Sequence, residues 1–193
     1  MELVLIKTYK HLSIYEKDWL AILEANQNIS PFLEYEFVYN LWEVLGEEKG
    51  VEIYAVKEHN RIIAFFPFQV KQTWFGYMLY FIAQDEGNCM DIIAKEREKD
   101  RVIMFVFDAL INKKKSIVFS LDGLLESGDT LSKLLSYLQA RSMKLNSKYI
   151  PKHDSIKFNT KTIFSTNTIR AKTYRNFLWT KEMVTAKVIR KSN

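Results

Sequence analysis

An almost unbroken apolar run at residues 61–70, with Ile-Ile-Ala-Phe-Phe-Pro-Phe after its first residue, constrains the fold most strongly. An alternating segment at 51–57 precedes it across a polar turn, and a third apolar segment at 77–83 follows. Alternation is typical of a strand with one wet face, whereas a continuous apolar run is typical of a strand covered on both faces. We therefore predict three consecutive strands, with 61–70 at the centre of a sheet.

Helices and further strands are predicted on both sides of these three. A short strand is expected at 3–8, and Ser13 and Glu16 have the spacing of a capping box that would begin the first helix. Pro31 is expected to begin a second helix that ends at Gly46. Later helices are predicted at 97–111 and 129–143, and later strands at 116–121, 148–150 and 155–164.

Length and composition favour one packed domain without a membrane span. The 193 residues are 48% hydrophobic, yet no apolar run reaches the roughly 18 residues that a spanning helix needs. Cys89 is the single cysteine, which excludes an intramolecular disulfide and a cysteine-rich zinc site. The first ten residues are too short and too charged for a signal peptide, so we expect a cytoplasmic protein.

Charge is distributed unevenly along the chain. Residues 1–140 carry 15 Lys and Arg against 21 Asp and Glu, whereas residues 141–193 carry 13 against 2. A basic tail of this kind indicates contact with something anionic: nucleic acid, a membrane surface or the acidic body of the protein itself. We predict an α/β domain at 1–165 and a basic C-terminal connector or tail at 166–193.

Four local features and the element order carry a resemblance to a known family. The features are Trp19, the sequence Pro-Phe-Leu-Glu-Tyr-Glu-Phe at 31–37, Phe-Phe-Pro-Phe at 65–68, and Asp91 after the third strand. Over about residues 10–150 the chain resembles the GNAT N-acetyltransferase fold. More narrowly, it resembles the N-terminal half of the cellulose-biosynthesis-associated GNAT family, whose members carry two GNAT-like halves and are related in architecture to the Fem proteins.

The resemblance implies a mixed α/β fold, with a central mixed β-sheet and helices on both faces. It also implies a GNAT-type acyltransferase, a transferase that uses acetyl-CoA or another acyl-CoA, with this chain as a truncated N-terminal half of a two-domain enzyme. The usual cofactor loop of that fold reads Gln/Arg-x-x-Gly-x-Gly/Ala, and its glycines let backbone N–H groups approach the pyrophosphate. Here the corresponding loop contains Gln84, Asp85, Glu86 and Gly87 without a second glycine. We therefore expect no standard cofactor site in this chain.

Other catalytic and binding residues are sparse. Asp85, Glu86 and Asp91 would suit a general base or a cationic amine substrate, against the alternative of a solvated acidic loop. Cys89 is expected to be a small buried residue rather than a nucleophile. The three histidines, His11, His59 and His153, fall in unrelated segments, so we predict no metal site.

Aromatic residues suggest two binding surfaces. Trp74, Phe75 and Tyr77 surround a predicted turn, where exposed apolar bulk indicates either a substrate groove or a partner surface for a second GNAT-like domain or another copy of the chain. The tail interleaves basic residues with Tyr174 and Trp179, which suggests a non-enzymatic module that binds nucleic acid or an anionic membrane. No recognisable nucleic-acid-binding motif accompanies the tail, so nucleic acid is not the partner that we expect.

Overall fold

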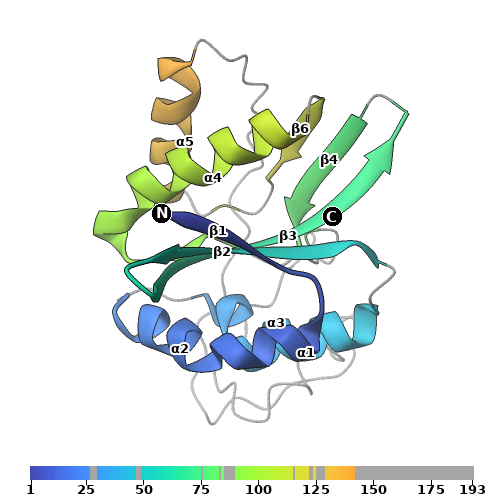
Figure 1. Ribbon diagram of the computed structural model, residues 1–193, viewed down its shortest axis with the longest axis vertical. Coiled ribbons are helices and arrows are strands. Elements are labelled where there is room, and N and C mark those ends of the chain that lie inside the picture. Colours follow the sequence, from blue (N-terminus) through green and yellow to red (C-terminus); the bar gives the residue numbers. More distant parts are fainter. Residues whose placement is uncertain are drawn as a thin grey trace, which may run out of the picture. The chain divides into compact units, whose positions relative to one another are not determined.

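The computed structural model describes residues 1–26, 30–46, 49–74, 76–82, 84, 90–114, 116–121, 124 and 129–141 (Figure 1). All of these belong to the first of two units into which the chain divides, Met1–Lys144. The predicted strands at 148–150 and 155–164, and the predicted boundary at 165, lie outside the described residues.

Six strands, five α-helices and three 3-10 helices make up this part of the chain. The strands are β1 (Glu2–Ile6), β2 (Val51–Glu58), β3 (Arg61–Thr73), β4 (Gly76–Phe81), β5 (Ile93–Ala94) and β6 (Ile117–Ser120). The α-helices are α1 (Tyr9–Leu12), α2 (Glu16–Glu24), α3 (Tyr35–Leu45), α4 (Lys99–Lys113) and α5 (Asp129–Ala140). The 3-10 helices are η1 (Ser13–Tyr15), η2 (Pro31–Leu33) and η5 (Glu96–Glu98).

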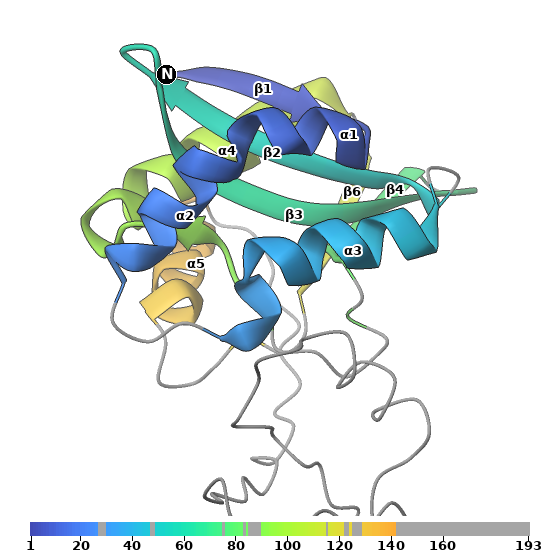
Figure 2. The ribbon, with the colours of Figure 1, turned by 90° about the horizontal axis from the view of Figure 1, so that it is seen from below.

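The strands form one mixed sheet in the order β1-β2-β3-β4-β6, in which β4 and β6 run parallel and the other neighbours run antiparallel. Helices α1, α2 and α3 cover one face, and α4 and α5 lie on the other (Figure 1, Figure 2). The predicted α/β fold, a mixed sheet with helices on both faces, is confirmed. Within the described residues, no helix is long and apolar enough to cross a membrane.

Strand β3 has one neighbour on one edge and two on the other. Residues 61–69 pair with β2, which occupies one edge along nearly the whole strand. On the opposite edge, β4 pairs with residues 68–73 and β5 pairs with Ala64 and Phe65. The chain therefore leaves the sheet after β4 and re-enters it a few residues further along the same edge of β3.

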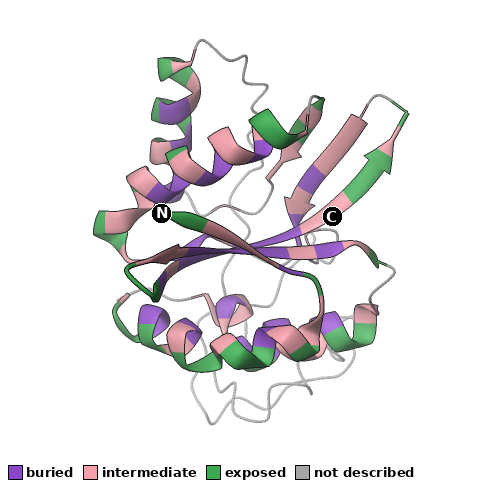
Figure 3. Cartoon of the chain, viewed as in Figure 1, coloured by how far each residue is buried: buried purple, intermediate pink, exposed green. Residues whose placement is uncertain are grey.

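Burial on both faces explains the apolar run that the sequence shows. Phe65 and Phe66 are both fully buried, and successive strand side chains point to opposite faces. The Phe65 ring lies 4.7 Å from the ring of Trp19 on α2, and the Phe66 ring lies 6.4 Å from that of Phe107 on α4. Figure 3 shows the resulting band of buried residues through the middle of the sheet. The prediction that this strand is central and covered on both sides is confirmed.

Two glutamates of β2 hold the two ends of α4. The Glu58 carboxylate accepts two hydrogen bonds from Arg101, both 2.7 Å long, and Lys114 Nζ lies 4.0 Å from Glu52 Oε2. Six residues of strand and thirteen residues of helix each span about 20 Å, so the two pairs are in register. The even-numbered positions of β2 therefore set the direction in which α4 crosses the sheet.

The start of the first helical segment differs from the prediction. Thr8 has extended backbone angles, and its Oγ1 accepts a hydrogen bond of 3.1 Å from the backbone N–H of His11, so Thr8 is the N-cap. Ser13 lies inside the helical segment and donates its hydroxyl to the Lys10 carbonyl. The capping box of Ser13 and Glu16 is therefore wrong, because the helical turns begin directly after β1.

The second helical segment follows the prediction closely. Pro31 begins the 3-10 turn η2, and the Ser30 hydroxyl accepts a hydrogen bond from the Phe32 N–H. Helix α3 then ends at Gly46, whose φ of 80° lies in the region that favours glycine.

Two buried tryptophans provide a matched test of this packing. Trp19 and Trp42 are both fully buried, but Trp19 Nε1 donates a 2.9 Å hydrogen bond to the Leu33 carbonyl, whereas Trp42 Nε1 has no partner among the described residues. Both Trp→Phe substitutions remove similar volume, and Trp19→Phe also leaves a buried carbonyl unpaired. We expect Trp19→Phe to lower the free energy of unfolding by about 1–3 kcal/mol more than Trp42→Phe does. Urea unfolding followed by circular dichroism measures both, and equal losses would contradict the expectation.

Candidate functional site

The connection from β4 to α4 is the part of the chain where the family resemblance places a cofactor loop. Asp85 and Glu86, the residues expected in that loop, lie outside the described residues. The structure also separates this loop from the helix, because β5 and η5 lie between them. The segment directly before α4 is Lys95-Glu96-Arg97-Glu98, which contains η5.

This segment lacks the features of a backbone phosphate cradle. It contains no glycine, and the Glu98 N–H is used in a 2.8 Å hydrogen bond to the Lys95 carbonyl within the 3-10 turn. Glu96 and Asp100 add exposed carboxylates at the same helix end. A pyrophosphate here would meet two carboxylates and few free N–H groups, although the helix dipole alone would attract it.

A cluster of charged side chains joins β5, α4 and α5 at this end of the sheet. Lys99 Nζ, on the first turn of α4, donates to Asp129 Oδ1 at 2.7 Å and to the buried Thr130 hydroxyl at 3.0 Å. It also lies 3.6 Å from Asp91 Oδ2, while Asp91 Oδ1 accepts a 2.6 Å hydrogen bond from the Ile92 N–H. Asp91 and Asp129 therefore share one ammonium group.

Lys133 extends the cluster from the second turn of α5. Its Nζ lies 3.2 Å from Asp129 Oδ2 and 3.3 Å from Asp100 Oδ2, and it donates a 3.0 Å hydrogen bond to the Glu96 carbonyl. Positive and negative groups thus alternate along the contact between the two helices. We refer to Asp91, Lys99, Asp129 and Lys133 as the charge cluster.

The two carboxylates of the charge cluster are affected in opposite directions. Burial raises the pKa of Asp91, and the partial compensation by Lys99 is not enough to offset it. Burial would also raise the pKa of Asp129, but the hydrogen bonds and charges of Lys99 and Lys133 outweigh it and lower that pKa. The two lysines therefore stabilise the ionised form of Asp129. Burial, in contrast, destabilises the ionised form of Asp91.

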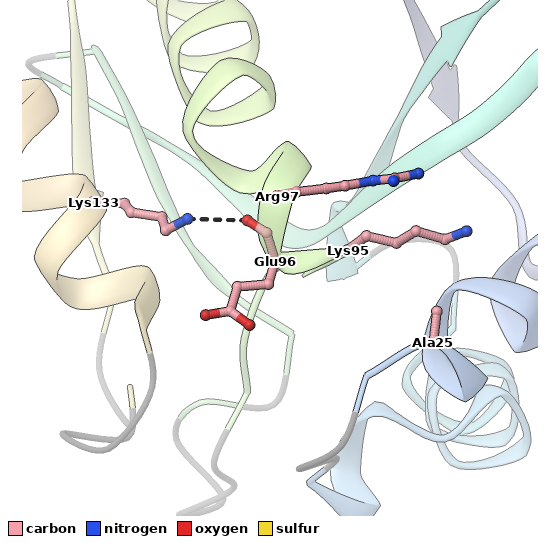
Figure 4. A pocket seen from close by; sticks show the side chains of 5 residues that line it. All are labelled: Ala25, Lys95, Glu96, Arg97 and Lys133. Carbon is pink, nitrogen blue, oxygen red and sulfur yellow. Dashed lines mark hydrogen bonds between the residues drawn. The ribbon is translucent and has the colours of Figure 1, made fainter.

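An open cavity of about 620 Å³ lies beside the charge cluster. It is lined by Ala25 at the end of α2, by Lys95, Glu96 and Arg97, and by Lys133. In Figure 4, the Lys95 and Arg97 side chains extend side by side toward the α2 side, while Lys133 reaches the Glu96 carbonyl from the other side. The Arg97 side chain is 80% exposed. Chemically, the cavity combines the cationic side chains of Lys95, Arg97 and Lys133 with the Glu96 carboxylate, and it has no backbone cradle.

Of the four predicted substrate residues, the structure describes Asp91 and Trp74, and it places these two far apart. Asp91 lies next to β5, which pairs with Phe65, whereas Trp74 lies in the turn that follows the other end of β3. Trp74 follows Phe65 by nine residues of extended chain, which is about 30 Å. Asp91 is engaged within the charge cluster, and Trp74 is 96% exposed. A role for either residue in substrate binding stays a prediction.

Metal-ligating groups are not gathered in the described part of the chain, where no three His, Cys, Asp or Glu residues could hold one ion. His11 packs its ring against Tyr15, and His59 occupies the β2–β3 turn. Cys89 and His153 lie outside the described residues.

The basic residues of the cavity were not among the sequence-based candidates. Lys95 and Arg97 are close in sequence, Arg97 being the first residue of the predicted helix at 97–111, and Lys133 follows 36 residues after Arg97. Their convergence depends on how α5 packs against the start of α4. A local pattern could have shown the Lys-x-Arg pair but not the third cation.

Comparisons with known proteins find a likeness in structure alone. No family model matches the chain, and no curated protein matches it. A ribosomal-protein-alanine N-acetyltransferase from Brucella melitensis biovar Abortus 2308 is 8% identical with a TM-score of 0.46, covering 79% of this chain and 99% of its own. An aminoglycoside acetyltransferase from an uncultured soil metagenomic sample is 10% identical with a TM-score of 0.46, covering 81% and 96%.

Glucosamine-6-phosphate N-acetyltransferase from Arabidopsis thaliana is 12% identical with a TM-score of 0.41, covering 79% of this chain and 99% of its own. These solved structures are acetyltransferases to which the chain is similar in fold. With identities of 12% or less and TM-scores below 0.5, the likeness establishes neither an activity nor a substrate for this chain. The narrower resemblance to the cellulose-biosynthesis-associated family stays a prediction.

The charge cluster predicts opposite pH dependences for two Asp→Asn variants. Asp129 has a pKa below its ordinary value of 3.8, so its stabilising effect is present above that pH and is lost as the pH falls through the native pKa. Asp129→Asn should therefore lower the free energy of unfolding at pH 7 by about 1–2 kcal/mol, and the loss should shrink in acid.

Asp91 has a raised pKa, so its ionisation destabilises the native state as the pH rises above 3.8. The free energy of unfolding of Asp91→Asn, relative to that of the wild type, should therefore be higher at pH 7 than at pH 3. Urea unfolding of both variants and the wild type at pH 3, 5 and 7 measures these differences. Parallel pH profiles for the two variants would contradict the assignment.

Proposed function

We propose that the chain is a GNAT-like half of a two-domain acyltransferase-type protein, and that this half serves as a scaffold or substrate-side module that does not hold acyl-CoA in the standard way. Support for the family comes from the four local features of the sequence and from the sheet order. The order includes the parallel pair β4 and β6 with α4 between them in sequence. The activity itself would then depend on a partner half.

Three of the four features that carry the resemblance form one packing unit, which favours a shared fold. Trp19 donates to the Leu33 carbonyl within the 31–37 motif, and its ring packs on Phe65 in the 65–68 motif. Asp91, the remaining feature, contributes to the charge cluster. All four features thus hold α2, η2, β3 and β5 in place, so they support a common architecture more than a common reaction.

The structure at the start of α4 is the main support for the proposal that this chain does not bind the cofactor in the standard way. The glycine-free segment Lys95–Glu98 forms a 3-10 turn, and Lys133 is already bound to its Glu96 carbonyl. A phosphate cradle requires backbone N–H groups that a ligand can approach closely. The residues present therefore do not fit the pyrophosphate of acetyl-CoA in the usual manner, and we derive no catalytic step through that cofactor.

A titration of the full chain with acetyl-CoA tests the proposal. We expect no measurable heat at micromolar concentrations in isothermal titration calorimetry. Micromolar binding would contradict the proposal, and the variant Lys95→Ala with Arg97→Ala would then show whether the cavity beside the charge cluster is responsible. Lys10→Ala with Lys17→Ala is the matched control, because both lysines are exposed on the helices of the other face.

An alternative is a non-enzymatic module whose basic tail contacts nucleic acid or an anionic membrane. The charge of 13 Lys and Arg against 2 Asp and Glu in residues 141–193 favours it. The aromatic residues of that tail lie outside the described residues. Deletion of residues 160–193 should abolish any salt-dependent shift of single-stranded DNA, and the absence of a shift at low salt would remove this alternative.

A further inference from the structure

The turn between β3 and β4 places one large aromatic side chain almost entirely in solvent. Trp74 is 96% exposed, whereas Trp19 and Trp42 are fully buried. The hairpin that carries Trp74 extends beyond the helices on both faces of the sheet (Figure 1, Figure 2). Indole combines an apolar body with a polar N–H group, which is the chemistry found at membrane–water interfaces.

Two exposed lysines lie on elements connected to this hairpin, one on β3 and one at the end of α4. Lys71 belongs to β3 and lies three residues before Trp74. Lys113 is the last residue of α4. The Tyr77 N–H donates a 2.9 Å hydrogen bond to the Ser116 carbonyl, which ties β4 to the residues after that helix. Neither Lys71 nor Lys113 forms an ion pair with any residue that the structure describes.

Lys114, the residue after Lys113, contacts side chains of the sheet. Its Nζ lies 4.0 Å above the centre of the Tyr77 ring and 4.0 Å from Glu52 Oε2. The Glu52 carboxylate is therefore already engaged by Lys114 and by the Tyr54 hydroxyl. It does not neutralise Lys71 or Lys113, so no carboxylate among the described residues competes with an anionic partner for these two lysines.

We propose that this end of the molecule, Trp74 with Lys71 and Lys113, attaches the protein peripherally to an anionic lipid surface. We call these three residues the hairpin anchor. The indole would enter the headgroup region while the two lysines pair with lipid phosphates and carboxylates. The inference is independent of whether the chain binds acyl-CoA.

The charge of the rest of the domain sets the orientation of this contact. Residues 1–140 carry six more acidic than basic residues, so most of the domain surface is repelled by an anionic membrane. The hairpin anchor carries two cations and no carboxylate. An anionic surface would therefore attract this end and repel the rest of residues 1–140, which gives this part of the chain one preferred approach.

Other occupants fit the hairpin anchor less well. Two copies meeting anchor to anchor would bring four lysines together without a compensating carboxylate. Single-stranded nucleic acid is normally bound along a groove with several aromatic rings on which successive bases stack. Trp74 is the single large aromatic side chain among the strongly exposed residues of the described part. A lipid surface requires neither a groove nor a partner of matching shape.

Backbone contacts on both sides of β4 hold the β3–β4 hairpin in place beside Trp74. The ladder between β3 and β4 runs from the pair Phe68 and Phe81 to the pair Thr73 and Gly76, next to the turn. The Thr73 hydroxyl closes it by donating a 2.9 Å hydrogen bond to the Gly76 carbonyl. Gly76 has a φ of 137°, and a Cβ there would lie 2.4 Å from the Ser116 carbonyl oxygen. The backbone beside Trp74 is therefore held by both β3 and the start of β6.

Vesicle co-sedimentation of the full chain tests the hairpin anchor. Vesicles of phosphatidylcholine alone are compared with vesicles containing one quarter phosphatidylserine. We expect binding to the anionic vesicles, with at least a threefold lower bound fraction for Trp74→Ala and for Lys71→Glu with Lys113→Glu. The matched control, Lys10→Glu with Lys17→Glu, has the same change in net charge on exposed helix positions and should bind like the wild type.

Each variant keeps the basic tail, so any contribution of residues 141–193 to vesicle binding is the same in all of them. Equal binding of the wild type, the Trp74 variant and the double Lys variant would overturn the proposal. So would binding to both vesicle types alike, or none to either. Brominated lipid should quench wild-type tryptophan fluorescence, and Trp74→Phe should remove that quenching, whereas persistent quenching would assign the contact to another tryptophan.

Sedimentation velocity of the protein without lipid tests the remaining alternative, in which the hairpin anchor binds a second copy of the chain. The wild type and Trp74→Ala should sediment as species of the same size. A wild-type dimer that becomes a monomer in Trp74→Ala would show that the hairpin anchor joins two copies of the chain, and this result would also overturn the lipid assignment.

Discussion

The limited number of hydrogen-bonding edges on β3 organises the rest of the structure. Strand β2 occupies one edge, so β4 and β5 must share the other. This sharing returns the chain to the sheet immediately before α4 and therefore determines where that helix starts. Glu58 and Glu52 on β2 then hold its two ends, and the charge cluster joins its first turn to α5. Phe65 and Phe66 fill the two faces between these layers.

Most of the fold was predictable because its signals are local. The apolar run at 61–70 and the alternation at 51–57 each indicate a strand without reference to distant residues. The first helix start was missed because Ser13 and Glu16 match a capping box equally well whether or not an earlier residue already caps the turn. Thr8 does so here, at the end of β1. The return of β5 was also not predictable as a pairing, because two residues contain too little pattern to identify their neighbour in β3.

The candidate site was much less predictable, since its contacts join residues far apart in the chain. Asp91 was recognised as a polar residue after the third strand, but its partners Lys99 and Asp129 depend on the packing of α4 and α5. The expected loop at 84–87 lies mostly outside the described residues, and β5 and η5 come between it and α4 along the chain. The identity of a charged residue does not show whether its side chain contacts a ligand or a neighbouring helix. For Asp91 and Lys133, the structure supplies the helix contact.

The shared edge of β3 also affects how this chain can tolerate change over evolution. The excursion between β4 and β5 leaves the sheet where the Ile82 N–H bonds to the Pro67 carbonyl, and it returns where Ile93 pairs with Phe65. Its two ends are thus attached to nearly adjacent positions of one strand. Insertions or deletions between them would leave the register of β3 intact, and doubling the loop would cost about 0.6 kcal/mol in closure entropy. This excursion is therefore a position where new recognition sequences can be acquired without redesign of the sheet.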